Sequence, residues 1–242
     1  MPIKVINKAA RRLLELELHR RGYMLKPIGN SNKKIDIAKI PEFISIAGPI
    51  LSEKRTMLGV DRAYVLWQCI RNISSLKGAV AEVGVFRGGG SKLILATLQA
   101  LNAPKPMYVC DTFEGMPEIQ APVDNRRIGG FEETSFESVK TYLQAFPNAT
   151  VLKGPFDQTQ AQIREPEFCF AHLDVDLYNS FRDCLQFFMP RLVIGGVLLL
   201  DDYGFTSCPG AKKAVDECAE QYLGKAHLLH LETGQALLTR YC

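Results

Sequence analysis

Apolar residues in this chain follow two patterns that alternate from about residue 60 onwards. Short continuous apolar runs, bounded by polar residues or glycine, are typical of strands buried on both faces of a parallel sheet. Between these runs, apolar residues recur at helical spacing and predict amphipathic helices. We expect strands at 79–85, 106–110, 150–153, 168–173, 197–200, 226–231 and 235–241, and helices at 60–74, 91–101, 136–145, 178–188 and 210–222. This alternation predicts an α/β fold with a doubly wound sheet.

The last two expected strands are separated only by Glu232-Thr233-Gly234. A connection this short cannot make the crossover that parallel strands need, so these two strands must form an antiparallel hairpin. The sequence therefore predicts a seven-stranded, mostly parallel sheet that ends in an antiparallel hairpin.

Residues 5–22 carry a broad apolar face, and Lys and Arg outnumber Glu on the rest of that segment. A basic amphipathic helix of this kind can lie on a membrane surface, pack on its own domain or pack on a second subunit. We favour packing, and a homo-oligomer is therefore expected. Glycine, proline and asparagine then mark an irregular segment up to about residue 40.

Composition narrows the class of protein and of partner. The chain has 242 residues, of which 47% are hydrophobic and 23% charged, as in a globular protein with one large domain. A net charge of +3 is too small to indicate a nucleic-acid partner. No apolar stretch approaches the roughly 20 residues of a membrane span. Seven scattered cysteines without a disulfide framework, and a start without an apolar signal segment, predict a cytoplasmic location.

Carboxylates stand at the ends of two strongly apolar runs. Asp174 and Asp176 follow the run 168–173, and Asp201-Asp202 follow the run 197–200. In open α/β sheets, ligands bind beyond the carboxyl ends of the strands, so these acids are expected at the mouth of the site. One such Asp more often caps the next helix, but four at two strand ends favour a hard cation such as Mg²⁺.

A glycine-rich turn follows the first expected strand, where Gly84 precedes Gly88-Gly89-Gly90. Glycines at this place let the backbone approach a ligand closely. Asp111 ends the next strand, where an acid can bind the two hydroxyls of a ribose or, alternatively, cap a helix. The glycine spacing differs from the G-x-G-x-x-G of dehydrogenases, and there is no phosphate-binding P-loop motif.

Four segments resemble, in order, the motifs of the macrocin O-methyltransferase family, which modifies sugars in antibiotic biosynthesis. They are Glu82-Val83-Gly84-Val85-Phe86-Arg87-Gly88-Gly89, Asp111-Thr112-Phe113-Glu114-Gly115-Met116-Pro117, His172-Leu173-Asp174-Val175-Asp176-Leu177-Tyr178 and Asp201-Asp202-Tyr203-Gly204. The resemblance extends from about Thr56 to the C-terminus. It implies a class I methyltransferase domain over residues 56–242. The preceding residues 1–55 fall outside the resemblance, and we expect them to form an N-terminal helical extension that serves as a lid or for oligomerisation.

The resemblance also implies S-adenosylmethionine as the cofactor, with contacts along the first two motifs and in four further places. The implied cofactor-binding residues are Glu82, Gly84, Val85, Phe86, Arg87, Gly88, Asp111, Thr112, Phe113 and Asp174, with Phe156 and Asp157 near the adenine and Thr56 and Ser135 placed by neighbourhood. By the same resemblance Asp174, Asp201 and Asp202 are the Mg²⁺ ligands, and Asp174 and Asp176 are the catalytic residues.

In this interpretation Mg²⁺ lowers the pKa of an acceptor hydroxyl, and Asp176 removes its proton before the oxygen attacks the sulfonium methyl. His172 and Tyr178 are alternative bases, although His172 lies among apolar neighbours and packing is also a plausible role for Tyr178. The long loop at 112–135 is expected to act as a lid.

We therefore expect an O-methyltransferase that acts on a sugar hydroxyl of a glycosylated small molecule, with vicinal hydroxyls on the acceptor. One alternative keeps the chemistry but takes a catechol-type aromatic diol. An NAD-dependent oxidoreductase is less consistent with the glycine spacing. An inactive binding domain is less consistent with the retained carboxylates, because idle clustered acids destabilise a protein.

Overall fold

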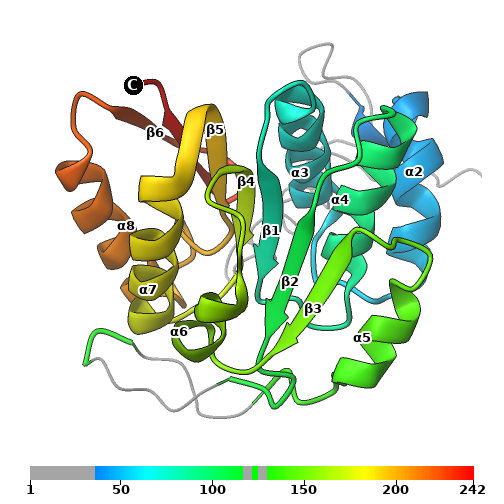
Figure 1. The fold of residues 1–242 in the computed structure, drawn as a ribbon, viewed down its shortest axis with the longest axis horizontal. Coiled ribbons are helices and arrows are strands. Elements are labelled where there is room, and N and C mark those ends of the chain that lie inside the picture. Colours follow the sequence, from blue (N-terminus) through cyan, green and yellow to red (C-terminus); the bar gives the residue numbers. More distant parts are fainter. Residues whose placement is uncertain (1–35, 117–121, 125–129) are drawn as a thin grey trace, which may run out of the picture. The chain divides into compact units, whose positions relative to one another are not determined.

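A seven-stranded sheet in the order β3-β2-β1-β4-β5-β7-β6 forms the centre of the fold (Figure 1). Its strands are β1 (Ala79–Val83), β2 (Met107–Asp111), β3 (Ala149–Lys153), β4 (Phe168–Leu173), β5 (Leu192–Leu200), β6 (Ala226–His230) and β7 (Ala236–Arg240). Strands β1 to β5 are parallel, and β7 runs antiparallel to both β5 and β6. The predicted seven-stranded sheet with its closing antiparallel hairpin is confirmed. The computed structural model describes residues 36–116, 122–124 and 130–242.

Strand β5 begins at Leu192, five residues before the start that the apolar pattern predicts. Gly195 and Gly196 interrupt the apolar run, and the pairing of β4 with β5 shifts register between Phe168 and Phe170. A glycine pair inside a strand marks such an irregularity, which hides the first half of the strand from periodicity.

Seven α-helices are present in the described part of the chain. They are α2 (Pro41–Ser52), α3 (Val60–Ile73), α4 (Gly89–Ala100), α5 (Phe136–Tyr142), α6 (Phe156–Thr159), α7 (Tyr178–Phe188) and α8 (Pro209–Gln221), with 3-10 turns at Ile37–Lys39, Gln160–Gln162 and Met189–Arg191. The five helices expected from residue 60 onwards are all found. Neither α2 nor α6 was predicted individually, since α2 contains two prolines and α6 is a single turn.

The residues from Ile37 to Cys242 form one compact unit. Phe43 of α2 packs on Tyr64 and Trp67 of α3, with ring centroids 5.2 and 5.6 Å apart. Helix α2 therefore shares the core of the residues that follow it. The expected helix at 5–22 lies outside the described residues, so the extension and its role stay predictions.

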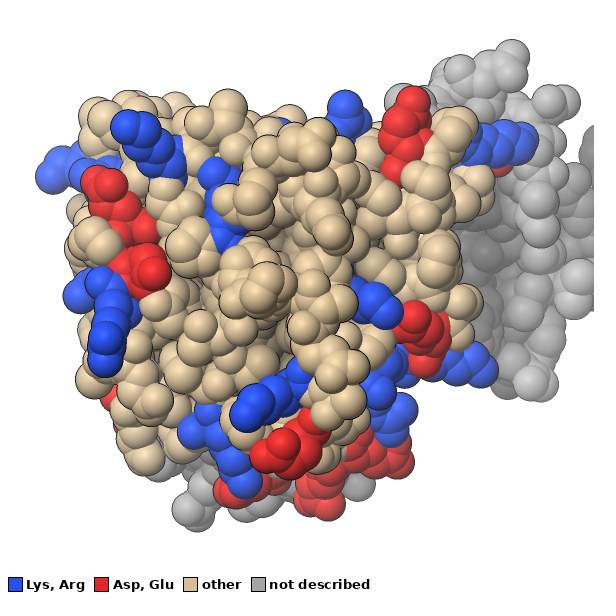
Figure 2. All heavy atoms as spheres, turned by 45° about the vertical axis from the view of Figure 1, so that its right-hand side comes forward, with Lys and Arg blue, Asp and Glu red and all other residues tan. Residues whose placement is uncertain are grey.

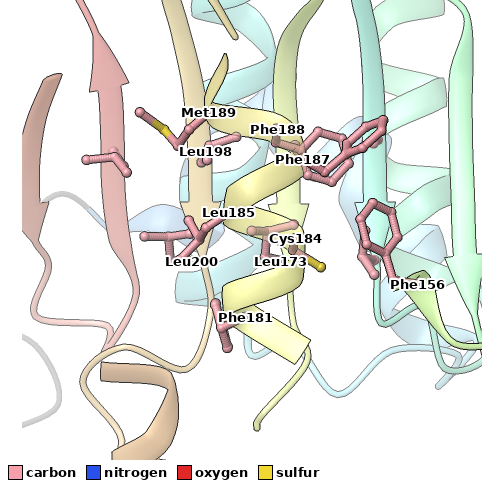
Figure 3. Packing of buried hydrophobic residues seen from close by; sticks show 14 of the residues in the cluster. Phe156, Leu173, Phe181, Cys184, Leu185, Phe187, Phe188, Met189, Leu198 and Leu200 are labelled. Atoms are coloured by element: carbon pink, nitrogen blue, oxygen red, sulfur yellow. The ribbon is translucent and has the colours of Figure 1, made fainter. Parts of the chain in front are cut away.

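Hydrophobic residues on the two faces of the sheet are covered by different helices. Helices α2 to α5 cover one face, and α6, α7 and α8 cover the other (Figure 1). Figure 3 shows Leu185, Phe187 and Phe188 of α7 directed towards β4 and β5. The Phe188 ring lies 5.0 Å from Phe168 of β4 and 5.4 Å from Phe156 of α6. This packing fixes the strands whose carboxyl ends carry the candidate site.

Charged side chains of both signs are interspersed on the face drawn in Figure 2, around a largely uncharged central area. Among the described helices, none combines the length and the apolar character that crossing a membrane requires.

Candidate functional site

A cavity of about 590 Å³ opens at the carboxyl ends of β1, β2 and β4. Twelve of the residues proposed from the sequence line it: Thr56, Glu82, Gly84, Val85, Phe86, Asp111, Thr112, Phe156, Asp157, Asp174, Asp176 and Asp202. These residues come from six separate stretches of the chain. The topology therefore brings the predicted cofactor and metal segments to one cavity.

The turn between β1 and α4 needs glycine for two physical reasons. Gly84 has φ +83°, and a Cβ on it would stand 1.8 Å from the carbonyl oxygen of Asp174. Gly88 has φ +87° and is the N-cap of α4. Positive φ costs little for glycine alone, so the loop can pass close to β4 and end in a left-handed cap. The backbone then forms one wall of the cavity.

Asp111 fastens this glycine loop to the end of β2. Its Oδ2 accepts hydrogen bonds from the backbone N–H groups of Val85 (2.7 Å) and Phe86 (2.9 Å), and its Oδ1 accepts one from Phe113 (2.7 Å). A carboxylate has about four acceptor positions, so contact with a ribose hydroxyl remains open to it. The sequence indicated an acid at this place but not its role in holding the loop.

Glu82 and His172 form a buried pair in the cavity floor, on neighbouring positions of β1 and β4. Glu82 accepts a hydrogen bond from Ser91, and His172 Nδ1 lies 2.9 Å from Glu82 Oε1. On its other side, His172 Nε2 lies 3.4 Å from Asp201 Oδ1. Burial opposes protonation of the imidazole, but the two carboxylates outweigh it and raise the pKa of His172 to about 10. A protonated imidazole cannot accept a proton, so His172 does not suit the role of general base.

Asp201 is fully buried and does not line the cavity. Arg62 of α3 pairs with its Oδ2, and Gln235 Nε2 donates to its Oδ1 at 2.7 Å. Burial acts to raise its pKa, but the hydrogen bond and charge of His172 and the charge of Arg62 lower the pKa of Asp201 below its ordinary value. Asp201 is therefore an ionised carboxylate that donors hold on both oxygens.

The acids at the ends of β4 and β5 form two adjacent groups with closely spaced ligand atoms. In the first group, ligand atoms of His172, Asp174 and Asp201 lie within 4.8 Å of one another. In the second group, those of Asp176, Asp202 and Cys208 do the same. The proposed metal set of Asp174, Asp201 and Asp202 is thus distributed over both groups.

Too little positive charge surrounds Asp174 to balance the neighbouring carboxylates. Burial and the charges of Asp201 and Asp202 raise the pKa of Asp174 well above its ordinary value, and the charge of His172 offsets this only in part. A divalent cation beside Asp174 would remove this repulsion, and carboxylate oxygens are ligands that Mg²⁺ prefers. The residues present therefore fit such an ion.

The chain turns sharply between the two acids that follow β4. The strand ends at Leu173, and Leu177 N donates to Val175 O at 2.5 Å around Asp176, which has φ +56°. The two Asp side chains therefore do not belong to one continuing strand. The Asp176 N–H donates to Asp202 Oδ2 at 2.8 Å, and Cys208 Sγ donates to Asp176 Oδ1 at 3.3 Å.

Four of the proposed cofactor residues do not line the cavity and have other contacts. Arg87 pairs with Glu133, and Ser135 caps α5 by accepting from Ser138 N at 3.4 Å. Gly88 caps α4, and Phe113 packs in the core. The hydroxyl of Tyr178, the alternative base, donates a hydrogen bond to Glu217 at 2.7 Å. This bond raises the pKa of Tyr178, so the side chain keeps its own proton and is poorly suited to accept another.

Four residues that sequence reasoning missed belong to the site or its support. Met57, Arg62 and Phe205 line the cavity, and Gln235 contacts Asp201 from the β6–β7 hairpin. Met57 and Phe205 are unusually exposed for apolar side chains, at 63% and 37%. No local pattern marks any of them, because each acquires its place only when distant segments meet.

Comparison with known families gives a match to the model described as Macrocin-O-methyltransferase (TylF), over residues 48–232. The chain belongs to the macrocin O-methyltransferase family. It is therefore an S-adenosylmethionine-dependent O-methyltransferase with the class I fold, as its sequence motifs implied.

Individual relatives agree with this assignment. The chain is 32% identical over 174 residues to 8-demethyl-8-(2,3-dimethoxy-alpha-L-rhamnosyl)-tetracenomycin-C 4'-O-methyltransferase of Streptomyces olivaceus, covering 66% of this chain and 67% of that one. It is 28% identical to demethyldecarbamoylnovobiocin O-methyltransferase of Streptomyces niveus, covering 67% of this chain and 66% of that one. These alignments thus span about two thirds of each relative. Among solved structures, the O-methyltransferase NovP superimposes with a TM-score of 0.71 at 24% identity, covering 83% of this chain and 97% of that one.

Proposed function

We propose that this methyltransferase is Mg²⁺-dependent and transfers the methyl group of S-adenosylmethionine to a sugar hydroxyl of a glycosylated small molecule. The observation that carries the metal dependence is the convergence of acids at the ends of β4 and β5. Ligand atoms of His172, Asp174 and Asp201 lie within 4.8 Å of one another, and those of Asp176, Asp202 and Cys208 do the same. The names of the relatives support the acceptor class, since they describe methylation of rhamnosyl-tetracenomycin and novobiocin-type molecules.

We assign two sets of lining residues to the donor and to the acceptor. The glycine loop, Asp111 and the segment Phe156-Asp157 line the cavity, and we assign them to the donor. Asp174, Asp176 and Asp202 line the same cavity together with Met57 and Phe205, and we assign them to the acceptor. The exposed apolar side chains provide surface for the aglycone, and the acids face its hydroxyls.

Asp174, Asp201 and Asp202 are the residues that would hold the ion. Bound there, Mg²⁺ would act as a Lewis acid and lower the pKa of the attacking hydroxyl. Asp176 lines the cavity as one of the acceptor residues, and we assign it to accept the hydroxyl proton at its carboxylate. General-base help of this kind typically contributes ~10²–10⁴-fold to the rate.

The chain's own packing orients these groups. The thiol of Cys208 and the N–H of Asp176 fix the second acid group, and the donors on Asp201 fix the first. The acceptor oxygen can then attack the sulfonium methyl in line. Positioning of two reactants in this way reaches effective molarities of roughly 10⁵–10⁸ M.

The proposal also includes a cytoplasmic location and a homo-oligomeric state. No disulfide joins the seven cysteines, all of which lie in the described part of the chain. This supports a reducing compartment. The homo-oligomer rests on the amphipathic pattern at residues 5–22 alone, and light scattering on the full chain tests it.

Methyl transfer from S-adenosylmethionine should be measured against a rhamnosyl glycoside and a simple catechol, with added Mg²⁺ and with chelator. We expect turnover of the glycoside that chelator abolishes, and loss of that turnover in Asp174→Asn and Asp176→Asn. Asp201→Asn is a poorer test, because it leaves the charges of Arg62 and His172 without their partner.

The control is affinity for S-adenosylhomocysteine, which calorimetry should find unchanged within about threefold in Asp176→Asn. Full activity in chelator would refute the metal role. Turnover of the catechol but not of any glycoside would replace the proposed acceptor by an aromatic diol.

A further inference from the structure

Gln235 is a buried polar residue that the proposed function does not yet use. It follows the turn between β6 and β7, its exposed fraction is 0%, and it lies beyond residues 48–232 that match the family. A buried amide destabilises a protein unless its polar atoms are hydrogen-bonded. The buried amide of Gln235 therefore needs hydrogen-bond partners.

The side-chain amide of Gln235 is held at both ends. Its Nε2 donates to Asp201 Oδ1 at 2.7 Å, and its Oε1 lies 3.2 Å from Thr233 Oγ1. Its backbone is fixed as well, because Leu231 N donates to Gln235 O at 2.9 Å across the turn. The hairpin thus presents one N–H group to Asp201 in a defined direction.

The other two donors on Asp201 differ from Gln235 in charge and in place. Arg62 pairs with Oδ2, and its side chain is 20% exposed in the cavity wall. His172 lies farther from Oδ1 than Gln235 does, at 3.4 Å. The Arg62 guanidinium brings positive charge that opposes a cation at the same carboxylate. Gln235 orients Asp201 by a short bond without adding charge.

We propose that Gln235 is a positioning residue for the divalent-cation site, acting through Asp201. This inference rests on the proposed function, since it takes Asp201 as a ligand. The hairpin holds Oδ1 so that the carboxylate keeps its orientation towards Asp174, whose ligand oxygen lies within 4.8 Å. Hydrogen-bond partners that orient metal ligands in this way typically contribute ~10–100-fold to metal affinity.

Gln235→Met tests the proposal, because methionine keeps the length and approximate volume but has no N–H donor. The matched control is Leu238→Ala. Leu238 lies on β7, is fully buried and packs in the core, and its replacement keeps the Gln235 side chain. For each full-length variant we would measure Mn²⁺ affinity by electron paramagnetic resonance, S-adenosylhomocysteine affinity in chelator, and the melting temperature.

We expect Gln235→Met to weaken Mn²⁺ binding ~10–100-fold while leaving S-adenosylhomocysteine affinity within about twofold. Its activity should recover at high metal concentration, so that the metal requirement rises more than kcat falls. Leu238→Ala should lower the melting temperature and leave Mn²⁺ affinity unchanged. Thr233→Val, which removes only the support of Gln235, should give a smaller loss in the same direction.

Unchanged or stronger Mn²⁺ binding in Gln235→Met would overturn the proposal. So would equal losses in Gln235→Met and Leu238→Ala, because the effect would then follow stability alone. Failure of the unmodified protein to bind Mn²⁺ would instead refute the metal role itself, which separates this inference from the proposed function.

Discussion

Replacement of Asp174 by asparagine should make the metal-free protein more stable while destroying its metal dependence. Asn keeps the shape and hydrogen-bonding capacity of the side chain but removes its charge. The reason for the gain is that Asp174 lies among carboxylates that repel it when no cation is present. A residue kept for function is here expected to lower stability.

The magnitude follows from the spacing of the ligand atoms. Two unit charges 4.8 Å apart repel by about 3 kcal/mol at an effective dielectric constant of ~20. His172 attracts Asp174 and offsets part of the repulsion from Asp201, Asp202 and Asp176. Asp174 borders the cavity, so solvent screens the remainder, and we expect a net gain of about 1–2 kcal/mol. For a chain of this size that raises the melting temperature by roughly 2–8 °C.

The stability gain of Asp174→Asn should increase as the pH rises. Because the pKa of Asp174 is raised in the folded protein, that carboxyl keeps its proton at pH values where the unfolded chain has lost it. Its contribution to stability is therefore lost as pH rises from the unfolded pKa through the folded pKa. The advantage of Asp174→Asn should be small at about pH 3, where Asp174 is largely protonated in both the folded and the unfolded protein, and largest at about pH 8.

Thermal unfolding in chelator, followed by circular dichroism at both pH values, measures this effect. Asp157→Asn is the control, since Asp157 lines the cavity outside both acid groups; it should change stability by less than about 0.5 kcal/mol. Added Mg²⁺ should stabilise the unmodified protein and not Asp174→Asn. A lower melting temperature for Asp174→Asn in chelator at high pH, or the same gain at both pH values, would refute the reasoning.

Two further predictions concern the cavity walls. Gly84→Ala should lower the free energy of unfolding, measured in urea, by roughly 2–4 kcal/mol, because its Cβ would collide with the Asp174 carbonyl. The control is Gly224→Ala, since Gly224 also has a positive φ but has open space around it. This control should lower the free energy of unfolding by only about 1 kcal/mol. Equal losses would show that backbone strain, not the close approach, requires glycine. Phe205→Ala should raise the KM for the acceptor several-fold and leave the affinity for S-adenosylhomocysteine unchanged. The control Leu229→Ala, at an exposed position on β6, should change neither quantity. A change in the KM for S-adenosylmethionine alone would contradict the assignment of Phe205.

Much of the fold was predictable because the central strands β1, β2 and β4 are buried on both faces. Burial of this kind demands a continuous apolar run, so β4 is predicted to the residue. The prediction failed where the run was broken, at Gly195-Gly196 in β5, and where an element was too short for periodicity, as in α6. The glycine loop was also predictable, since a close backbone approach excludes every other residue type at Gly84.

The sequence by itself determined the succession of strands and helices along the chain, the glycine turn and the presence of acids at two strand ends, because these follow from local spacing and burial. Only the tertiary structure decided what each acid contacts. Arg62 and Asp201 are 139 positions apart, and His172 and Glu82 are 90 apart. Periodicity describes which face a residue occupies but carries no information about a partner from another element. The pairing that ionises Asp201, and the excess of negative charge left around Asp174, therefore arise only when the strands meet.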